Sequence, residues 1–216
     1  MNERGHISWV HKAFSFLFPI VLKEINSPVY LQFVLKNNII LLNTQQANQS
    51  NGTLKYALHQ AFSHFNWYQK KEIQHILILG FGLGSAYDLL APTYPKAIFT
   101  GVEIQPEIKD FYTQYYPKNL SLNWQIQSAA DFINITNSTY DLILIDVFDD
   151  TAIPDAILTL NFFKTCLQKL NQKGTILFNT LSQNKIEDTY PELHTFFDTY
   201  RDTITSNRFY LKEKIK

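Results

Sequence analysis

The sequence contains a single cysteine, Cys166, among its 216 residues. One cysteine excludes an internal disulfide and is typical of a protein that works in a reducing compartment, so we predict a cytoplasmic location. Lysine and arginine together number 19, as do aspartate and glutamate, and no block of basic residues stands out. Nucleic acid is therefore not an expected partner. The six histidines do not group with cysteine or carboxylates at metal-ligand spacing, so we expect no metal site.

Long hydrophobic runs are missing as well. The most apolar stretch, residues 13–22, contains Pro19 and is too short to span a bilayer, which takes about 20 apolar residues in a helix. It also lacks the small-residue cleavage site of a signal peptide. We interpret it as a buried packing segment and expect no membrane association.

Glycine is scarce, with 7 in the chain, yet three of them stand close together at Gly80, Gly82 and Gly84. An apolar run at 76–79 comes before them and a helix-compatible stretch at 85–90 follows. Strand, glycine turn and helix form the first unit of a nucleotide-binding α/β fold, because a tight turn and close ligand approach need residues without Cβ. The spacing differs from the dinucleotide pattern Gly-x-Gly-x-x-Gly and resembles motif I of S-adenosylmethionine-dependent transferases. A purely structural turn is the alternative.

Strand and helix signals alternate from His75 onward, which predicts a parallel sheet covered by helices on both faces. Strands are expected at 76–79, 97–102, 122–127, 140–148 and 175–180, and helices at 54–65, 106–116, 156–170 and 186–200. Two strand-like pieces in the tail predict a closing antiparallel hairpin. Upstream, 29–35 and 39–42 read as a hairpin, so we divide the chain into an N-terminal β region, 1–52, and a nucleoside-binding domain, 53–216. The predicted fold is α/β and Rossmann-like, of the S-adenosylmethionine-dependent methyltransferase type, with a mostly parallel seven-stranded sheet.

Acidic residues follow several of the predicted strands, where ligands of an open parallel sheet bind. Glu103 ends the second strand, and its carboxylate can accept both ribose hydroxyls of a nucleoside. Asp131 follows the third strand and can reach an adenine amino group. Asp146, Asp149 and Asp150 follow the fourth strand, where they can orient a cationic substrate or accept a proton. The structural alternatives are a solvent-facing glutamate for Glu103, a helix-capping or first-turn acid for Asp131, and a polar loop with one capping aspartate for the last three.

This pattern gives a specific set of candidate residues. Asp146 and Asp149 are the predicted catalytic residues. The predicted cofactor-binding residues are Gly80, Phe81, Gly82, Gly84, Glu103, Ile104, Ala130, Asp131 and Asp146.

Taken together, the motifs resemble the spermidine synthase-like branch of the S-adenosylmethionine-dependent transferases over roughly residues 43–180. The most specific part carries Tyr140-Asp141, the acids at 146 and 149, Pro154, Phe162-Phe163 and Gly174. The resemblance implies S-adenosylmethionine or its decarboxylated form as cofactor and a small-molecule acceptor, with amines among the candidates. Members are usually dimers or higher oligomers, so we expect a homodimer.

One departure from the family affects the predicted chemistry. Aminopropyltransferases carry an acid in the glycine loop that holds the ammonium of decarboxylated S-adenosylmethionine, and Leu83 stands there in this chain. A leucine cannot pair with an ammonium, so we predict methyl transfer to a small-molecule acceptor, and improved binding of the decarboxylated cofactor in Leu83→Asp. Aminopropyl transfer to a polyamine is the alternative, and a non-catalytic nucleoside-binding protein is a third hypothesis.

Overall fold

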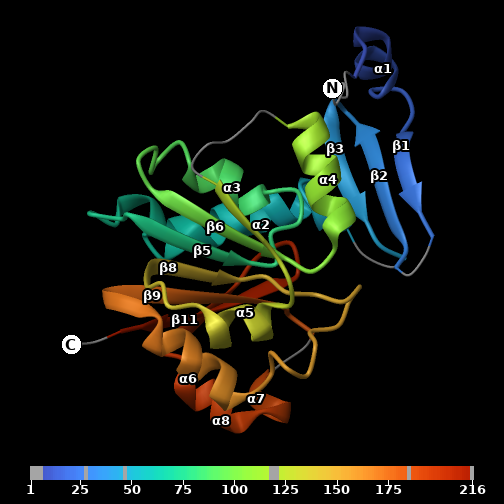
Figure 1. The fold of residues 1–216 in the computed structure, drawn as a ribbon. Coiled ribbons are helices and arrows are strands. Elements are labelled where there is room, and N and C mark those ends of the chain that lie inside the picture. Colours follow the sequence, from blue (N-terminus) through green and yellow to red (C-terminus); the bar gives the residue numbers. More distant parts are fainter. Residues whose placement is uncertain (1–6, 27–28, 46–47, 117–121, 184–185, 215–216) are drawn as a thin grey trace.

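The computed structural model describes residues 7–26, 29–45, 48–116, 122–183 and 186–214. Their N-terminal part is a helix followed by a small antiparallel sheet in the order β1-β2-β3-β4 (Figure 1). Its elements are α1 (Trp9–Phe14), β1 (Ile20–Ile25), β2 (Leu31–Lys36), β3 (Ile39–Asn43) and β4 (Asn48–Ser50). Asn37 and Asn38 have φ of 51° and 59°, so they form the tight turn between β2 and β3. The predicted hairpin and a small N-terminal sheet are confirmed, and the division of the chain into domains at residue 52 stays a prediction.

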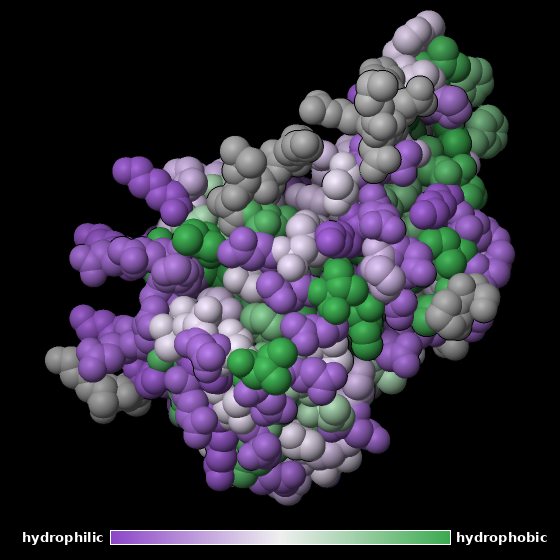
Figure 2. Space-filling model, in the orientation of Figure 1, coloured by the Kyte–Doolittle hydropathy of each residue, from purple (hydrophilic) through white to green (hydrophobic). Residues whose placement is uncertain are grey.

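The apolar segment at 13–22 is not the buried packing segment that we predicted. Phe14, Phe16, Leu17 and Phe18 are 55–71% exposed. They lie where α1 leads into β1, the outer strand of the small sheet, away from the seven-stranded sheet (Figure 1). Figure 2 shows hydrophobic side chains over this projecting end of the molecule. An apolar composition makes burial of a segment favourable, but burial also requires other elements of the fold that pack against the segment.

The larger sheet has seven strands in the order β10-β11-β9-β8-β5-β6-β7. The five strands from β7 to β9 are parallel, and β11 and β10 add the antiparallel hairpin at one edge. This confirms the predicted fold class. The strands are β5 (His75–Leu79), β6 (Ile98–Glu103), β7 (Leu122–Ile126), β8 (Tyr140–Ile145), β9 (Leu170–Leu181), β10 (Thr199–Asp202) and β11 (Asn207–Glu213).

Helices cover both faces of this sheet, with α2, α3 and α4 on one side and α5 to α8 on the other (Figure 1). Side chains of β5 and β8 alternate between two buried apolar clusters, one on each face. The helical elements are α2 (Gly52–His64), η1 (Trp67–Gln69), α3 (Ser85–Leu90), α4 (Pro106–Tyr115), α5 (Ala129–Ile135), α6 (Leu160–Gln168), α7 (Ile186–Thr189) and α8 (Pro191–Phe196). None of those in the described part of the chain has the length and apolar character needed to cross a bilayer.

Two predicted helices differ from the structure. The helix expected at 156–170 begins only at Leu160, because the Thr159 hydroxyl accepts a hydrogen bond from the backbone N–H of Phe162 and caps it there. The helix expected at 186–200 is split into α7 and α8, and 199–202 is strand β10. Pro191 explains the split, since a proline ends a preceding helix and suits the first turn of a new one.

The strand order places the glycine turn at the reversal point of the sheet. β5 pairs with β6 on one side and with β8 on the other, so the loops after these strands diverge over its carboxyl end. Ligands of open α/β sheets bind in the crevice at such a point. The small sheet packs beside it through a third apolar cluster, which joins β2 and β3 to α4 and the glycine loop.

Candidate functional site

A cavity of about 690 Å³ opens at the carboxyl ends of the central strands. Its walls come from the glycine loop, the ends of β6 and β8, the loop between β7 and α5, and the small sheet. The predicted site residues that line it are Gly80, Phe81, Gly82, Glu103, Ile104, Ala130, Asp146 and Asp149. The structure thus brings together most of the predicted set, and its remaining members, Gly84 and Asp131, have other positions.

The three glycines of the loop are required by its backbone. Gly80, Gly82 and Gly84 have φ of 82°, 54° and 79°, in the left-handed region that residues with a side chain rarely adopt. A Cβ on Gly80 would also lie 2.1 Å from the carbonyl oxygen of Asp146, so glycine lets β5 and β8 end side by side. Gly84 caps the start of α3 and is not part of the cavity wall.

The backbone N–H groups of the loop, from Gly80 to Gly84, all donate within the protein. The first two donate to the carbonyl of Val102 and the third to the carboxylate of Glu103. The fourth donates to the hydroxyl of Ser50, and the last to the carbonyl of Phe81. Phosphate-binding loops need such N–H groups for the ligand. This loop is therefore suited to a nucleoside without phosphates.

The position of Phe81, the aromatic residue of the loop, requires a glycine at 101, which the sequence analysis did not identify. The Phe81 ring packs edge-on against Trp124, with ring centroids 4.4 Å apart, and lies over Gly101 in β6. A Cβ on Gly101 would lie 2.5 Å from this ring. An isolated glycine inside a strand is the only sequence signal for this close approach.

Glu103 is held rigidly at the end of β6 and is 8% exposed. Its Oε1 accepts hydrogen bonds from the N–H groups of Ile104 and Gln105, at 2.8 and 3.1 Å, and its Oε2 accepts one from Gly82 at 3.0 Å. Burial raises the pKa of Glu103, and these three donors oppose that effect. A carboxylate has about four acceptor positions, so Oε2 keeps capacity for a ribose hydroxyl.

Asp131 lies beside the cavity in the first turn of α5 and is exposed. The Ser128 hydroxyl accepts from the N–H of Asp131 and donates to its carboxylate at 2.7 Å, as in a reciprocal helix cap. Ser128, Ala129 and Ala130 form the cavity wall at this point. Ser128 is therefore the cap of α5 and Asp131 is an acid of its first turn, which was the structural alternative, and the contact of Asp131 with adenine stays a prediction.

The acids after β8 line a further part of the cavity, next to the end of β5. Asp146 is half-buried and accepts a hydrogen bond from the Asn179 side chain at 2.7 Å. Burial raises the pKa of Asp146 to about 6, and the Asn179 donor opposes the rise. Asp149 is exposed and Asp150 is half-buried, and both line the same cavity. The predicted cluster of three carboxylates at the mouth of the sheet is therefore present.

The small sheet takes part in the site in a way that the sequence did not reveal. The Thr44 hydroxyl, just after β3, donates a hydrogen bond to the carboxylate of Asp150. Tyr30 and Gln45 also line the cavity. Asp150 has a φ of 54°, which aspartate tolerates better than most residues, and lies in a tight turn closed by Asp149 and Ala152. No local motif links these residues, because the contact joins positions 106 apart in sequence.

Leu83 does not face the cavity. Its side chain is fully buried in the cluster between the small sheet and α4, with Phe33 and Phe111 among its neighbours. The expected benefit of Leu83→Asp is therefore not supported, since it would bury a carboxylate among apolar side chains. For the same reason, the leucine does not report on which cofactor the cavity holds.

A family model described as the Spermine/spermidine synthase domain matches residues 55–206, which is most of the chain. The chain belongs to this family. The spermine/spermidine synthase match begins in α2 and ends at the turn before β11, so it includes every acid discussed above.

Sequence relatives carry a matching name. A polyamine aminopropyltransferase of Vibrio vulnificus (strain CMCP6) is 31% identical over 120 residues, which are 53% of this chain and 40% of that protein. The chain spans less than two thirds of the length of the curated relatives that it matches first.

Solved structures show the same fold. A spermidine synthase in complex with the transition state analogue AdoDATO superposes with a TM-score of 0.70 at 14% identity, covering 90% of this chain and 73% of that one. Human methyltransferase-like protein 13 in complex with SAH superposes with a TM-score of 0.62 at 19% identity, covering 74% of this chain and 82% of that one. The fold alone therefore does not decide between methyl and aminopropyl transfer. The family and the sequence relatives support aminopropyl transfer, the alternative, better than methyl transfer, the main prediction.

Proposed function

We propose that this spermine/spermidine synthase family member is an aminopropyltransferase that uses decarboxylated S-adenosylmethionine and a small amine. The observation that carries the proposal is the composition of one cavity. Glu103 and the glycine loop line one part of the cavity, and Asp146, Asp149 and Asp150 line another. Such a cavity suits a ligand pair with an uncharged nucleoside at one end and cationic amines at the other.

The residues present fit the nucleoside part of the cofactor. Glu103 is buried, fixed by three backbone donors and able to accept a ribose hydroxyl on Oε2. Gly82 lines the cavity without a side chain, which leaves room for the ligand against the backbone. The N–H groups of the glycine loop donate within the protein and are not available to a phosphate, which favours a nucleoside over a nucleotide.

Asp146 is the proposed proton acceptor. When bound, decarboxylated S-adenosylmethionine supplies an aminopropyl carbon activated by its sulfonium. Asp146 would take a proton from the acceptor ammonium, and the lone pair so freed would form the new carbon–nitrogen bond while the carbon–sulfur electron pair leaves with sulfur as methylthioadenosine. A pKa of about 6 suits this task, because Asp146 is ionised at neutral pH yet is more basic than an ordinary aspartate.

The amine end is proposed to rely on the acids after β8, because besides Glu103 they are the carboxylates that line the described cavity. Asp149 and Asp150 line the cavity beyond Asp146 and place negative charge where ammonium groups would enter. Thr44 fixes Asp150 from the small sheet. The small sheet is therefore proposed to set acceptor binding together with the loop.

We also propose a homodimer, as the family resemblance implies. The exposed side chains near α1, which include Trp9, Phe16 and Phe18, support this because large exposed apolar patches mark interaction surfaces. Sedimentation velocity at two concentrations tests it, and a monomer at both would contradict it.

Turnover with defined cofactors tests the proposed activity. The purified chain is incubated with decarboxylated S-adenosylmethionine or S-adenosylmethionine, each with putrescine, with spermidine or with no amine. We expect methylthioadenosine and an aminopropylated amine only where the decarboxylated cofactor and an amine are both present. Methylated amine with S-adenosylmethionine would support methyl transfer instead, and no turnover in any arm would support a non-catalytic role.

A further inference from the structure

Two buried amides connect Asp146 to the hairpin at the edge of the sheet. Asn179 lies inside β9 and is fully buried. Its Nδ2 donates to Asp146 Oδ1 at 2.7 Å, and its Oδ1 accepts from Nδ2 of Asn207 at 3.1 Å. Buried amides are costly unless they are hydrogen-bonded, so both ends of Asn179 are used.

The direction of this chain of hydrogen bonds follows from chemistry. An ionised Asp146 can only accept, so Asn179 must turn its NH₂ group toward it and its oxygen away. That oxygen then needs a donor, and the Asn207 NH₂ group supplies one. Conversely, Asn207 fixes which end of the Asn179 amide faces the cavity. The unpartnered alternative, with the Asn179 oxygen facing Asp146, would favour the protonated acid.

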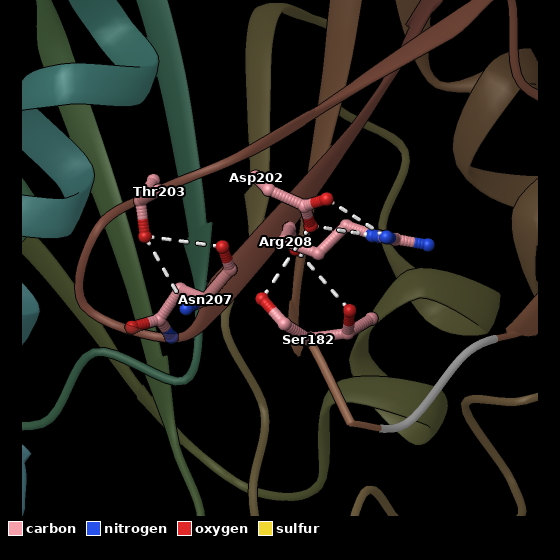
Figure 3. Close-up of polar contacts among 6 residues, drawn as sticks. Ser182, Asp202, Thr203, Asn207 and Arg208 are labelled. Atoms are coloured by element: carbon pink, nitrogen blue, oxygen red, sulfur yellow. Dashed lines mark hydrogen bonds and ion pairs between the residues drawn. The ribbon is translucent and has the colours of Figure 1, made fainter.

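Asn207 is itself held by the hairpin turn. The Thr203 hydroxyl accepts from the N–H of Asn207 at 3.2 Å and donates to its carbonyl at 3.0 Å. Next to it, the Arg208 guanidinium makes two contacts with the Asp202 carboxylate, at 2.6 and 2.8 Å (Figure 3). Asn207 is 7% exposed, so its side chain is enclosed between β9 and this turn.

We infer that Asn179 and Asn207 form a two-amide relay that positions Asp146 and keeps it ionised, with Asn207 acting only through Asn179. The inference rests on the proposed function in one respect, namely that Asp146 accepts a proton in turnover. Both asparagines are positioning residues, since neither lines the cavity. The hairpin that closes the sheet therefore has a role in the chemistry of a site formed by other strands.

To keep Asp146 ionised, the relay must offset the effect of the charged groups around it. Glu103 lines another part of the cavity, and Asp149 and Asp150 lie on the same loop, so the cavity side carries only negative neighbours among these residues. On the β9 and β11 side, Arg208 is engaged with Asp202. Neutral amides are therefore the groups that favour an ionised Asp146 from behind.

The test measures the pKa of Asp146 by NMR titration of carboxyl-labelled aspartate, with the signal assigned by Asp146→Asn. We expect Asn179→Leu to raise the midpoint by about one unit, the size of one charge-assisted hydrogen bond. Asn207→Leu, next to the turn, should shift it in the same direction by less. The Asn207 variant keeps the proposal testable should Asn179→Leu fail to fold.

A double variant separates a relay from two independent structural effects. If Asn207 acts through Asn179, then adding Asn207→Leu to Asn179→Leu shifts the midpoint no further. Additive shifts would overturn the relay, as would an unchanged midpoint in Asn207→Leu.

The chain offers a matched control at the other end of the same two strands. Asn171 in β9 donates its Nδ2 to Asp141 in β8 at 2.7 Å, and Asp141 does not line the cavity. Asn171→Leu should leave the Asp146 midpoint where it is, and an equal shift would overturn the proposal. Because the NMR readout needs no turnover, it stays decisive if the proposed activity fails. Where turnover is present, the acidic limb of kcat/KM should move with the midpoint.

Discussion

The two walls of the cavity are built in different ways. The nucleoside wall comes from one short loop, Gly80 to Gly82, and from Glu103 at the end of the next strand, and hydrogen bonds from the loop N–H groups join the two. The acceptor wall combines the loop after β8 with Thr44, which follows β3 of the small sheet, and Asn179 of β9 supports it from behind through Asp146. The first wall is local in sequence and shared by a whole fold class. The second is assembled from segments that are distant in sequence, and the proposed function assigns acceptor binding and proton transfer to it.

The largest expected effect falls on the acceptor wall. Asp146→Asn should reduce turnover by about 10²–10⁴-fold, the usual contribution of a general base, while nucleoside binding persists. In the unaltered protein kcat/KM should rise with pH through about 6, because Asp146 must lose its proton before it can accept one. Asp155→Asn, on the same loop but outside the cavity wall, is the control. Equal activity in the two variants would remove Asp146 from the mechanism.

A smaller effect is expected on the nucleoside wall from Gly82→Asn. Asparagine tolerates a positive φ, so its side chain fills the cavity with limited backbone strain. We expect roughly 10–100-fold weaker binding of methylthioadenosine by calorimetry, since overfilling a packed site costs about 1–3 kcal/mol. Gly84→Asn also has a positive φ but lies outside the cavity wall, and its Cβ would approach the rings of Tyr112 and Phe81 at 3.1 and 3.2 Å, so we expect a smaller loss of binding there. Equal losses in both would mean that the loop shape, and not the space at Gly82, determines binding.

Glu103→Gln tests the ribose contact. The amide keeps one oxygen for the backbone donors but loses the charge, so methylthioadenosine should bind about 1–2 kcal/mol more weakly. The loss should be much smaller for the analogue that lacks both ribose hydroxyls. Calorimetry with the two ligands decides, and the same loss for both would assign Glu103 to loop structure alone.

The smallest expected effect separates the two walls most cleanly. Thr44→Val removes the hydroxyl that holds Asp150 and should raise KM for the amine about fivefold, the cost of roughly 1 kcal/mol for one hydrogen bond. The affinity for methylthioadenosine should not change, and Thr44→Ser should restore the amine KM. A change in nucleoside affinity instead would mean that the small sheet supports the whole cavity rather than the acceptor wall.

The same contrast explains how much the sequence could predict. The glycine loop, the carboxylate of Glu103 and the acids after β8 follow directly from strand ends, so their convergence in one cavity was predictable. Asp131 was ambiguous, because an acid three residues after a serine is also common in the first turn of a helix that the serine caps.

Other features depend on contacts that no local pattern records. The amides of Asn179 and Asn207 meet across β9 and β11, 28 positions apart, and an asparagine inside an apolar strand carries no recognisable motif. From the sequence, Leu83 was placed at the cofactor site on the assumption that its side chain faces the cavity. Because the small sheet packs beside the glycine loop, the Leu83 side chain lies instead in the apolar cluster between this sheet and α4.

One labelling experiment tests the central claim most directly. Decarboxylated S-adenosylmethionine carrying a deuterated methyl group and a carbon-13 aminopropyl group is incubated with the chain and putrescine, and the amine product is analysed by mass spectrometry. The account predicts an amine that gains the three-carbon label and no deuterium, together with deuterated methylthioadenosine. An amine that gains the deuterated methyl group alone would contradict it.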